Sequence, residues 1–302
     1  MHRTDNAASP ATPEDGTELN ADVLPEAERS RRFWDAQVRD RRYEALDGPG
    51  MLLFDDRLVA LRRGREEAVM QRLLDDVLKR SPLRVLDAGC GTGRWSFWFA
   101  NHGAQVTAID FSQEMIDRCH QRQQELRDSG ESETADLITF RQQNAWEVDD
   151  EGRFDVIFCG GVLQCLDDEH VAEFARRASR ALLPEGVILT RDSVLPRRVD
   201  QHGDYPVHYR RAAEYESVFN ACGLTKIRDS GAWIHPQFVT KLPGWFPLLG
   251  RPLALAVDVD GWLLTHAPLK WLLPVYQRVT GRGIGAVPDH RFFLYQRRPQ
   301  DA

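Results

Sequence analysis

The chain has 302 residues, with 46 acidic and 39 basic side chains and a formal net charge of −7. This length is enough to bury a complete hydrophobic core in one large α/β domain with extensions, or in two modest domains. The acidic excess argues against nucleic acid as a partner, because binding along phosphates needs a basic surface. The five cysteines lack C-x-x-C spacing, so we expect neither a disulfide framework nor a metal site.

The N-terminal region divides into a tail and an extension. Residues 1–24 are rich in Ala, Ser, Thr, Pro, Asp and Glu and lack the apolar stretch of a signal peptide, so we expect a disordered tail and a cytoplasmic protein. An amphipathic pattern opens at Pro25 and continues to about Leu46, where the turn at 47–50 stops it. We expect residues 25–64 to form a helical extension, either a lid over a ligand or a cover for the sheet edge.

The middle of the chain alternates short apolar segments with helical ones, after a helix over 66–79 that ends before Pro82. This alternation implies right-handed crossovers and an α/β fold with a doubly wound, mostly parallel sheet covered on both faces. The expected strands are 83–87, 105–110, 136–140, 154–159 and 187–191, and the expected helices lie around 95–102, 113–127, 168–183 and 211–222.

After Gly223 the pattern changes. Residues 224–233 and 291–297 look like two further strands, the second within a last strand and tail over 290–302. Between them, residues 236–289 are rich in Trp, Pro and Leu, more apolar than a surface loop needs. We expect this insertion to cap a ligand site, to lie peripherally on a membrane, or to form a homodimer contact. No segment reaches the about 18 uninterrupted apolar residues of a transmembrane helix.

The strongest motif is VLDAGCGTGR at 85–94, a strand that runs directly into a glycine loop and then a helix. Glycines let the backbone approach a ligand closely, and a helix N-terminus offers unpaired N–H groups. Asp87 closes this strand, and Asp110 ends the next one, where a carboxylate can accept hydrogen bonds from both ribose hydroxyls of a nucleoside. An NAD-dependent dehydrogenase is the main competitor, but its G-x-G-x-x-G spacing is absent.

At these residues the chain resembles the class I S-adenosylmethionine-dependent methyltransferase family, in its type 11/12-like form. The first motif of that family reads D-x-G-x-G-x-G, and its second strand ends in an acidic residue. The resemblance covers about residues 65–235. It implies S-adenosylmethionine as cofactor and a seven-stranded Rossmann-like sheet with an antiparallel last strand.

The resemblance also implies which residues bind the cofactor. The glycine loop would line its methionine part, and the next two strand ends would hold the ribose and the adenine. The residues so implied are Asp87, Gly89, Gly91 and Gly93 at the loop, Asp110 at the ribose, Phe111, Met115, Asn144 and Ala145 at the adenine, and Gly160 facing the methyl group. Arg94, directly after the loop, is expected either to pair with the methionine carboxylate or to be a solvated arginine on the first helical turn.

The sulfonium of such a cofactor is already an activated donor. The protein therefore needs only to place an acceptor in line with the methyl group, exclude water and remove a proton. We expect Asp192, Ser193 and His208 as catalytic candidates, with Gln164 and the His208-Tyr209-Arg210 cluster near the acceptor. For His208 the alternatives are a general base working near neutral pH and an ordinary loop histidine.

Three functions remain open from the sequence. An apolar cap would favour transfer to a small, partly apolar molecule. The stretch 167–174 with Arg191, Asp192 and Arg210 is similar to the protein α-N-terminal methyltransferases, which act on a peptide N-terminus. Ser193, however, stands in place of their asparagine, and 204–206 lack their Asp-Ser-Ser pattern. A non-catalytic scaffold of the same fold is the third, and the intact glycine loop argues against it.

Overall fold

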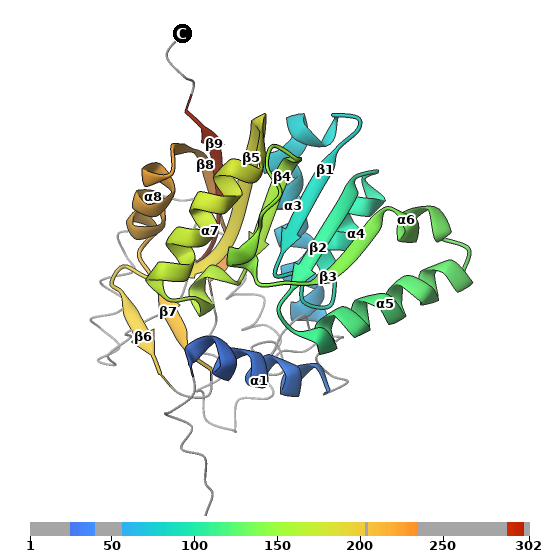
Figure 1. Ribbon diagram of the computed structural model, residues 1–302, viewed down its shortest axis with the longest axis horizontal. Coiled ribbons are helices and arrows are strands. Elements are labelled where there is room, and N and C mark those ends of the chain that lie inside the picture. Colours follow the sequence, from blue (N-terminus) through green and yellow to red (C-terminus); the bar gives the residue numbers. More distant parts are fainter. Residues whose placement is uncertain (1–24, 40–55, 203–204, 235–288, 299–302) are drawn as a thin grey trace, which may run out of the picture.

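Figure 1 shows a computed structural model of the protein, which describes residues 25–39, 56–202, 205–234 and 289–298. In this part of the chain one large sheet has the strand order β3-β2-β1-β4-β5-β9-β8. Its strands are β1 (Arg84–Ala88), β2 (Gln105–Asp110), β3 (Ile138–Gln142), β4 (Phe154–Gly160), β5 (Leu182–Val194), β8 (Leu224–Ile234) and β9 (Asp289–Arg297), and a separate hairpin pairs β6 (Val199–Gln201) with β7 (Val207–Tyr209).

The pairing confirms the predicted doubly wound α/β fold. Strands β1 to β5 pair in parallel, whereas β9 runs antiparallel between β5 and β8. Strand order reverses beside β1, since β2 and β3 lie on one side of it and β4 and β5 on the other. In open sheets of this kind, ligands bind outside the carboxyl ends of the strands at such a reversal.

Helices cover both faces of the sheet. The buried cluster on one face draws on α3, α4 and α5, and the cluster on the other face draws on α7 and α8. The helices are α1 (Glu26–Val38), α3 (Asp56–Leu78), α4 (Arg94–Asn101), α5 (Gln113–Asp128), α6 (Ser132–Asp136), α7 (Asp168–Ala181) and α8 (Ala212–Ala221), with 3-10 turns η3 (Ala145–Glu147) and η4 (Leu163–Cys165).

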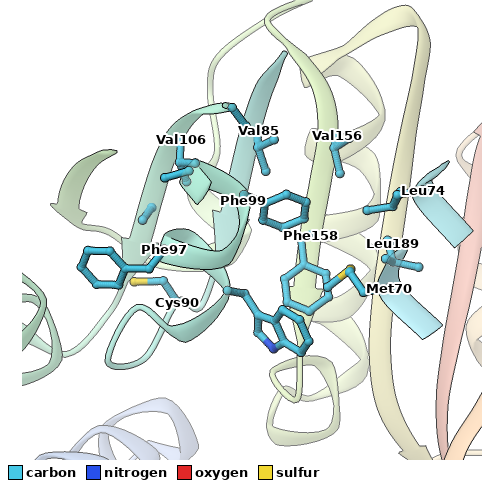
Figure 2. Packing of buried hydrophobic residues seen from close by; sticks show 14 of the residues in the cluster. Met70, Leu74, Val85, Cys90, Phe97, Phe99, Val106, Val156, Phe158 and Leu189 are labelled. Atoms are coloured by element: carbon cyan, nitrogen blue, oxygen red, sulfur yellow. The ribbon is translucent and has the colours of Figure 1, made fainter. Parts of the chain in front are cut away.

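The core fixes the sheet beneath the strand ends. Figure 2 shows Met70 and Leu74 of α3 beside Phe158 of β4 and Leu189 of β5, and all four side chains are at most 1% exposed. Successive residues of a strand point to opposite faces, so Leu189 joins the α3 cluster while its neighbour Ile188 joins the α7 cluster. Each such side chain contributes about 1.5–3 kcal/mol of burial free energy, which holds the strand ends in a fixed arrangement.

Several boundaries differ from the prediction. Helix α1 ends at Val38 rather than near Leu46, and α3 begins at Asp56, ten residues before the predicted start. The predicted boundary between residues 64 and 65 therefore falls inside one helix. The prediction started this helix too late because Gly64 and its charged neighbours interrupt the apolar spacing that is typical of a helix. Strand β3 starts two residues late, since the residues before it form α6.

Some predictions fall on residues that the structure does not describe. The tail at 1–24 and the apolar insertion, apart from Asp289 at the start of β9, lie outside the described residues. The membrane and dimer alternatives for that insertion therefore stay predictions. Within the described ranges, no helix combines the length and apolar character needed to cross a bilayer.

Candidate active site

The glycine loop leaves β1 in a conformation that other residues rarely adopt. Gly89, Gly91 and Gly93 have φ angles of 77°, 54° and 83°, the left-handed region that favours glycine. A Cβ atom at Gly89 would lie 2.1 Å from Cγ2 of Val162, whereas one at Gly91 would meet no atom of the described residues within 4 Å. Gly89 is therefore required by close packing, and Gly91 leaves open space beside its backbone where a ligand can approach.

Asp110 ties this loop to the next strand. Its Oδ2 accepts a hydrogen bond from the backbone N–H of Gly91 at 2.9 Å, and its Oδ1 accepts one from Ser112 at 3.0 Å. The side chain is buried, and burial raises the pKa of Asp110 to about 6. A carboxylate has about four acceptor positions, so Asp110 can still accept hydrogen bonds from the hydroxyl groups of a ligand.

Asp87 lies under the same loop. Its Oδ2 accepts a hydrogen bond from the Ser96 hydroxyl at 2.6 Å, which connects the end of β1 to the first turns of α4. Burial raises the pKa of Asp87 to about 7. The structure thus gives Asp87 a contact that holds the loop in shape.

The predicted adenine residues gather behind the ends of β2 and β3, which are adjacent because Asp110 pairs with Gln142. Phe111 lies 5.8 Å from the guanidinium of Arg31, and Met115 and Ala145 are buried. Asn144 precedes η3, and its buried Oδ1 has no hydrogen-bond partner among the described residues. This unsatisfied oxygen, the open space at Gly91 and the carboxylate of Asp110 fit a nucleoside cofactor.

The ends of β4 and β5 meet where Gly160 pairs with Arg191. A Cβ at Gly160 would lie 2.6 Å from Cζ of Phe158, so the strand end must be glycine unless that ring moves. Arg191 forms an ion pair with Glu66 of α3 (Nη1 to Oε1, 3.0 Å), and the predicted carboxylate ligand Arg94 pairs with the same glutamate (Nη1 to Oε2, 2.8 Å).

Asp192 follows on β5 and is 1% exposed. Its Oδ1 accepts a hydrogen bond from the backbone N–H of Gln164 at 3.2 Å, while its buried Oδ2 has no hydrogen-bond partner among the described residues. Burial raises the pKa of Asp192 to about 7. The neighbouring Ser193 donates its N–H to Oε1 of Gln164 at 3.0 Å, and its hydroxyl lies 3.1 Å from Nδ1 of His290.

His208 does not have the geometry of a general base. Its Nδ1 lies 2.8 Å from Oδ1 of Asp200, and its Nε2 lies 2.5 Å from Oε1 of Glu26. Since both ring nitrogens face carboxylates, neither has a lone pair directed at an acceptor. These contacts fasten α1 to β7 and favour the ordinary, structural alternative for His208. Its role as a general base stays a prediction.

Arg210, predicted near the acceptor, is also used inside the protein. It is 2% exposed, donates to Asp168 from Nε at 2.8 Å, and donates to the carbonyls of Leu163 and Leu166 at 2.8 and 2.6 Å. These contacts hold η4 against the start of α7, so the side chain is not available to a bound peptide.

An aromatic cluster that the sequence did not reveal lies by these strand ends. In Figure 1, α1 crosses the carboxyl edge of the sheet between the β6–β7 hairpin and α5. The ring of Phe33 in α1 stacks on Tyr205 with centroids 4.5 Å apart, and Trp34 meets Tyr205 edge-on at 5.4 Å. The Tyr205 hydroxyl lies 3.2 Å from Sγ of Cys165, next to Gln164. The sequence shows these aromatic residues, but it does not show that they are in contact.

The C-terminal end of α1 is held near the predicted cofactor-binding residues. Asp35 accepts a hydrogen bond from the Ser112 hydroxyl at 2.5 Å, and Arg39 pairs with Glu114 of α5. Helix α1 thus connects the hairpin to α5 across the strand ends. In the described part of the chain, no three His, Cys, Asp or Glu side chains gather in a group that could hold a metal ion.

Comparisons with known proteins identify the family of the chain. Residues 85–186 match the family described as a methyltransferase domain. The chain is 36% identical over 189 residues to a ubiquinone biosynthesis O-methyltransferase of Coxiella burnetii (strain Dugway 5J108-111), which covers 62% of this chain and 68% of that protein. Two other matches cover less of the relative's own length. The match with phosphoethanolamine N-methyltransferase 1 of Triticum aestivum has 26% identity and covers 66% of this chain and 38% of that protein. The match with a Bacillus subtilis relative covers 40% of that protein.

Solved structures share the fold. The 1,6-didemethyltoxoflavin-N1-methyltransferase of Burkholderia thailandensis, with its acceptor and S-adenosylhomocysteine bound, has a TM-score of 0.56 at 17% identity and covers 98% of this chain and 94% of that one. Magnesium protoporphyrin IX methyltransferase of Synechocystis PCC 6803, with S-adenosylmethionine bound, has a TM-score of 0.52 at 23% identity and covers 70% and 91%. The chain carries the glycine loop and Asp110, and it is 36% identical to the Coxiella relative. It therefore belongs to the class I S-adenosylmethionine-dependent methyltransferase family.

Proposed function

We propose that the protein transfers the methyl group of S-adenosylmethionine to a hydroxyl group of a small, partly apolar acceptor by in-line displacement. The observation that carries this proposal is Asp192, a buried carboxyl group with one oxygen lacking a partner among the described residues, at the end of β5. Bound S-adenosylmethionine supplies a methyl group already activated on a sulfonium. The chain must supply binding, alignment and a place for the proton.

The residues after β1, β2 and β3 would hold the cofactor. Asp110 would accept hydrogen bonds from the ribose hydroxyls, since its two oxygens are already oriented by the N–H groups of Gly91 and Ser112. Asn144 would meet the adenine edge, because its Oδ1 is buried without a partner among the described residues. Two or three such contacts at fixed strand ends orient a ligand without rearrangement of the protein.

Asp192 would accept the proton that leaves the acceptor. Backbone donation to Oδ1 fixes the orientation of the carboxyl group and leaves Oδ2 for the acceptor hydroxyl. With its pKa raised to about 7 by burial, the group can exchange a proton near neutral pH. The O–H bond then breaks toward Asp192 as the oxygen–methyl bond forms and the sulfur–methyl bond breaks. A buried carboxylate also disfavours an anionic acceptor.

The aromatic cluster supports a partly apolar acceptor. This cluster of Phe33, Trp34 and Tyr205 lies next to Cys165 and Gln164. Such a surface suits a partly apolar ligand, because ligand sites are mainly apolar with a few placed polar groups. The name of the 36% identical Coxiella relative, a ubiquinone biosynthesis O-methyltransferase, also supports oxygen as the acceptor atom. The buried position of Arg210 gives no support to a peptide acceptor.

The test is a methyl-transfer assay. Purified protein and S-adenosylmethionine labelled in the methyl group would be incubated with neutral phenols, with amines of similar size and with peptides bearing free N-termini. We expect label on phenolic oxygen only. Label on an amine or a peptide would overturn the acceptor assignment. Binding of S-adenosylhomocysteine with no transfer to any member of this panel would favour the scaffold alternative.

A further inference from the structure

Glu66 is a buried carboxylate for which the proposed reaction has no use. The residue lies on α3 and is 0% exposed. Its two oxygens receive two different guanidinium groups, from Arg94 at 2.8 Å and from Arg191 at 3.0 Å. Burying an ionised carboxylate is costly unless it is paired, so this position needs an explanation.

The two arginines come from the two sides of the glycine-lined strand ends. Arg94 directly follows Gly93 and begins α4. Arg191 pairs with Gly160 across β4 and β5, and its Nη2 lies 3.3 Å from the position that a Cβ of Gly161 would occupy. Glu66 therefore connects the glycine loop after β1 to the turn after β4.

One donor of this group has no partner among the described residues. Two guanidiniums, with side chains 16% and 13% exposed, share one fully buried carboxylate. The second acidic partner of Arg94, Glu67 at 3.4 Å, is 44% exposed, and solvent weakens its effect. The Nε atom of Arg191 is buried and has no hydrogen-bond partner among the described residues. Arg191 therefore keeps a donor without a partner among the described residues, at the end of the site where the loop would face an amino acid.

We propose that Glu66 is a positioning residue for the cofactor, orienting Arg191 together with Arg94 so that Arg191 binds the methionine carboxylate. The inference rests on the proposed function and adds to it. For the methionine carboxylate the sequence pointed to Arg94 alone, and only the structure connects Arg191 and Glu66 with it. Planar guanidiniums bind carboxylates through paired N–H donors, and such binding depends on their orientation.

The test compares two ligands that differ at the amino acid. S-Adenosylhomocysteine has the carboxylate, whereas 5′-methylthioadenosine keeps the nucleoside and the sulfur but lacks the amino acid. For Glu66→Gln we expect the Kd of S-adenosylhomocysteine to rise at least about tenfold, and that of 5′-methylthioadenosine to change less than about twofold, as for loss of one charge-assisted contact. Glu67→Gln is the matched control and should leave both values within about twofold.

Arg191→Lys provides a second variant in case Glu66→Gln does not fold, which a thermal unfolding curve would show. It keeps the charge but loses the planar donor pair, and we expect the same selective loss. An equal loss of both ligands would mean that the group only supports the fold and would overturn the inference. So would unchanged S-adenosylhomocysteine affinity in Arg191→Lys. If wild-type protein bound no S-adenosylhomocysteine, the proposed function itself would fail.

Discussion

The two ends of the carboxyl edge hold buried aspartates in different surroundings. At the β1–β2 end, Asp110 accepts two backbone N–H groups and Asp87 accepts the Ser96 hydroxyl. At the β5 end, Asp192 accepts the backbone of Gln164 on Oδ1, while Oδ2 has no partner among the described residues. Burial raises the pKa of all three carboxyls, so hydrogen bonding is what distinguishes them.

The two ends also differ in where their parts come from. Gly91 and Asp110, which hydrogen bond at one end, are 19 residues apart. At the other end, Phe33 of the N-terminal extension stacks on Tyr205 in the loop between β6 and β7. The β1–β2 end is a local structure in which both aspartates accept hydrogen bonds. The β5 end is assembled from remote segments, and Oδ2 of Asp192 has no partner there among the described residues.

The largest effect that would sharpen this comparison is expected at Asp192. Asp192→Asn removes the proposed proton acceptor, and turnover should fall by about 10²–10⁴-fold, the range for loss of a general base. The Kd of S-adenosylhomocysteine, measured by titration calorimetry, should stay within about twofold because the cofactor end is untouched.

Asp155→Asn is the matched control for that variant. Asp155 is also a buried aspartate that accepts a backbone N–H, from Arg84 at 2.9 Å, but it stands at the start of β4. Its turnover should equal that of the wild type. If Asp192→Asn kept normal turnover, the two ends would not differ in the way proposed.

The next largest effect concerns the glycine loop. Gly91→Val places a branched side chain in the open space and at a φ angle of 54° that valine avoids. The affinity for S-adenosylhomocysteine should fall at least about tenfold. Gly103→Val is the control. Gly103 has a φ of 78° and no atom of the described residues within 4 Å of its Cβ position, but it lies in the turn after α4. Similar losses in both variants would point to general strain.

A smaller effect is expected where α1 meets the hairpin. Glu26→Gln weakens the contact with His208 and should raise the acceptor KM by roughly threefold to tenfold, about 1 kcal/mol, with little change in S-adenosylhomocysteine affinity. Glu28→Gln alters a more exposed residue of the same helix, paired with Arg31 and Arg32, and should leave the KM unchanged. A change in cofactor affinity alone would show that α1 serves the other end of the site.

The smallest effect is on stability. The pKa of Asp192 is raised to about 7 from an unfolded value of about 4, so the folded state holds a proton that the unfolded state releases between these pH values. Stability is greatest below the lower value and is lost as pH rises toward 7. The melting temperature of the ligand-free protein should therefore be higher at pH 5.5 than at pH 7.5, and this difference should shrink in Asp192→Asn. An unchanged difference would exclude this titration.

Local pattern was enough to predict the strands and the loop of the β1–β2 end. A short apolar segment located β2 at its observed bounds, and a strand followed by alternating glycines placed the loop and Asp110 correctly at adjacent strand ends. These features need only neighbouring residues and the rule that parallel strands end at one edge.

The acceptor half could not be predicted in the same way. Strands β6 and β7 have three residues each, too few to show a period. The place of His208 between Glu26 and Asp200, and that of Arg210 against Asp168, depend on contacts with distant segments. In the sequence, a titratable side chain after a strand looks the same whether or not its polar atoms have hydrogen-bond partners in the fold.

The position of β9 has a consequence for how the protein is made. Strands β1 to β5 can pair with one another in the order in which they leave the ribosome. Among the described strands, β8 pairs with β9 alone, and β9 follows after residues 235–288. Until β9 inserts between β5 and β8, both strands have unpaired edges exposed to other nascent chains. A translation pause or truncation before Asp289 would thus leave a sheet with the cofactor loop in place and its other end open.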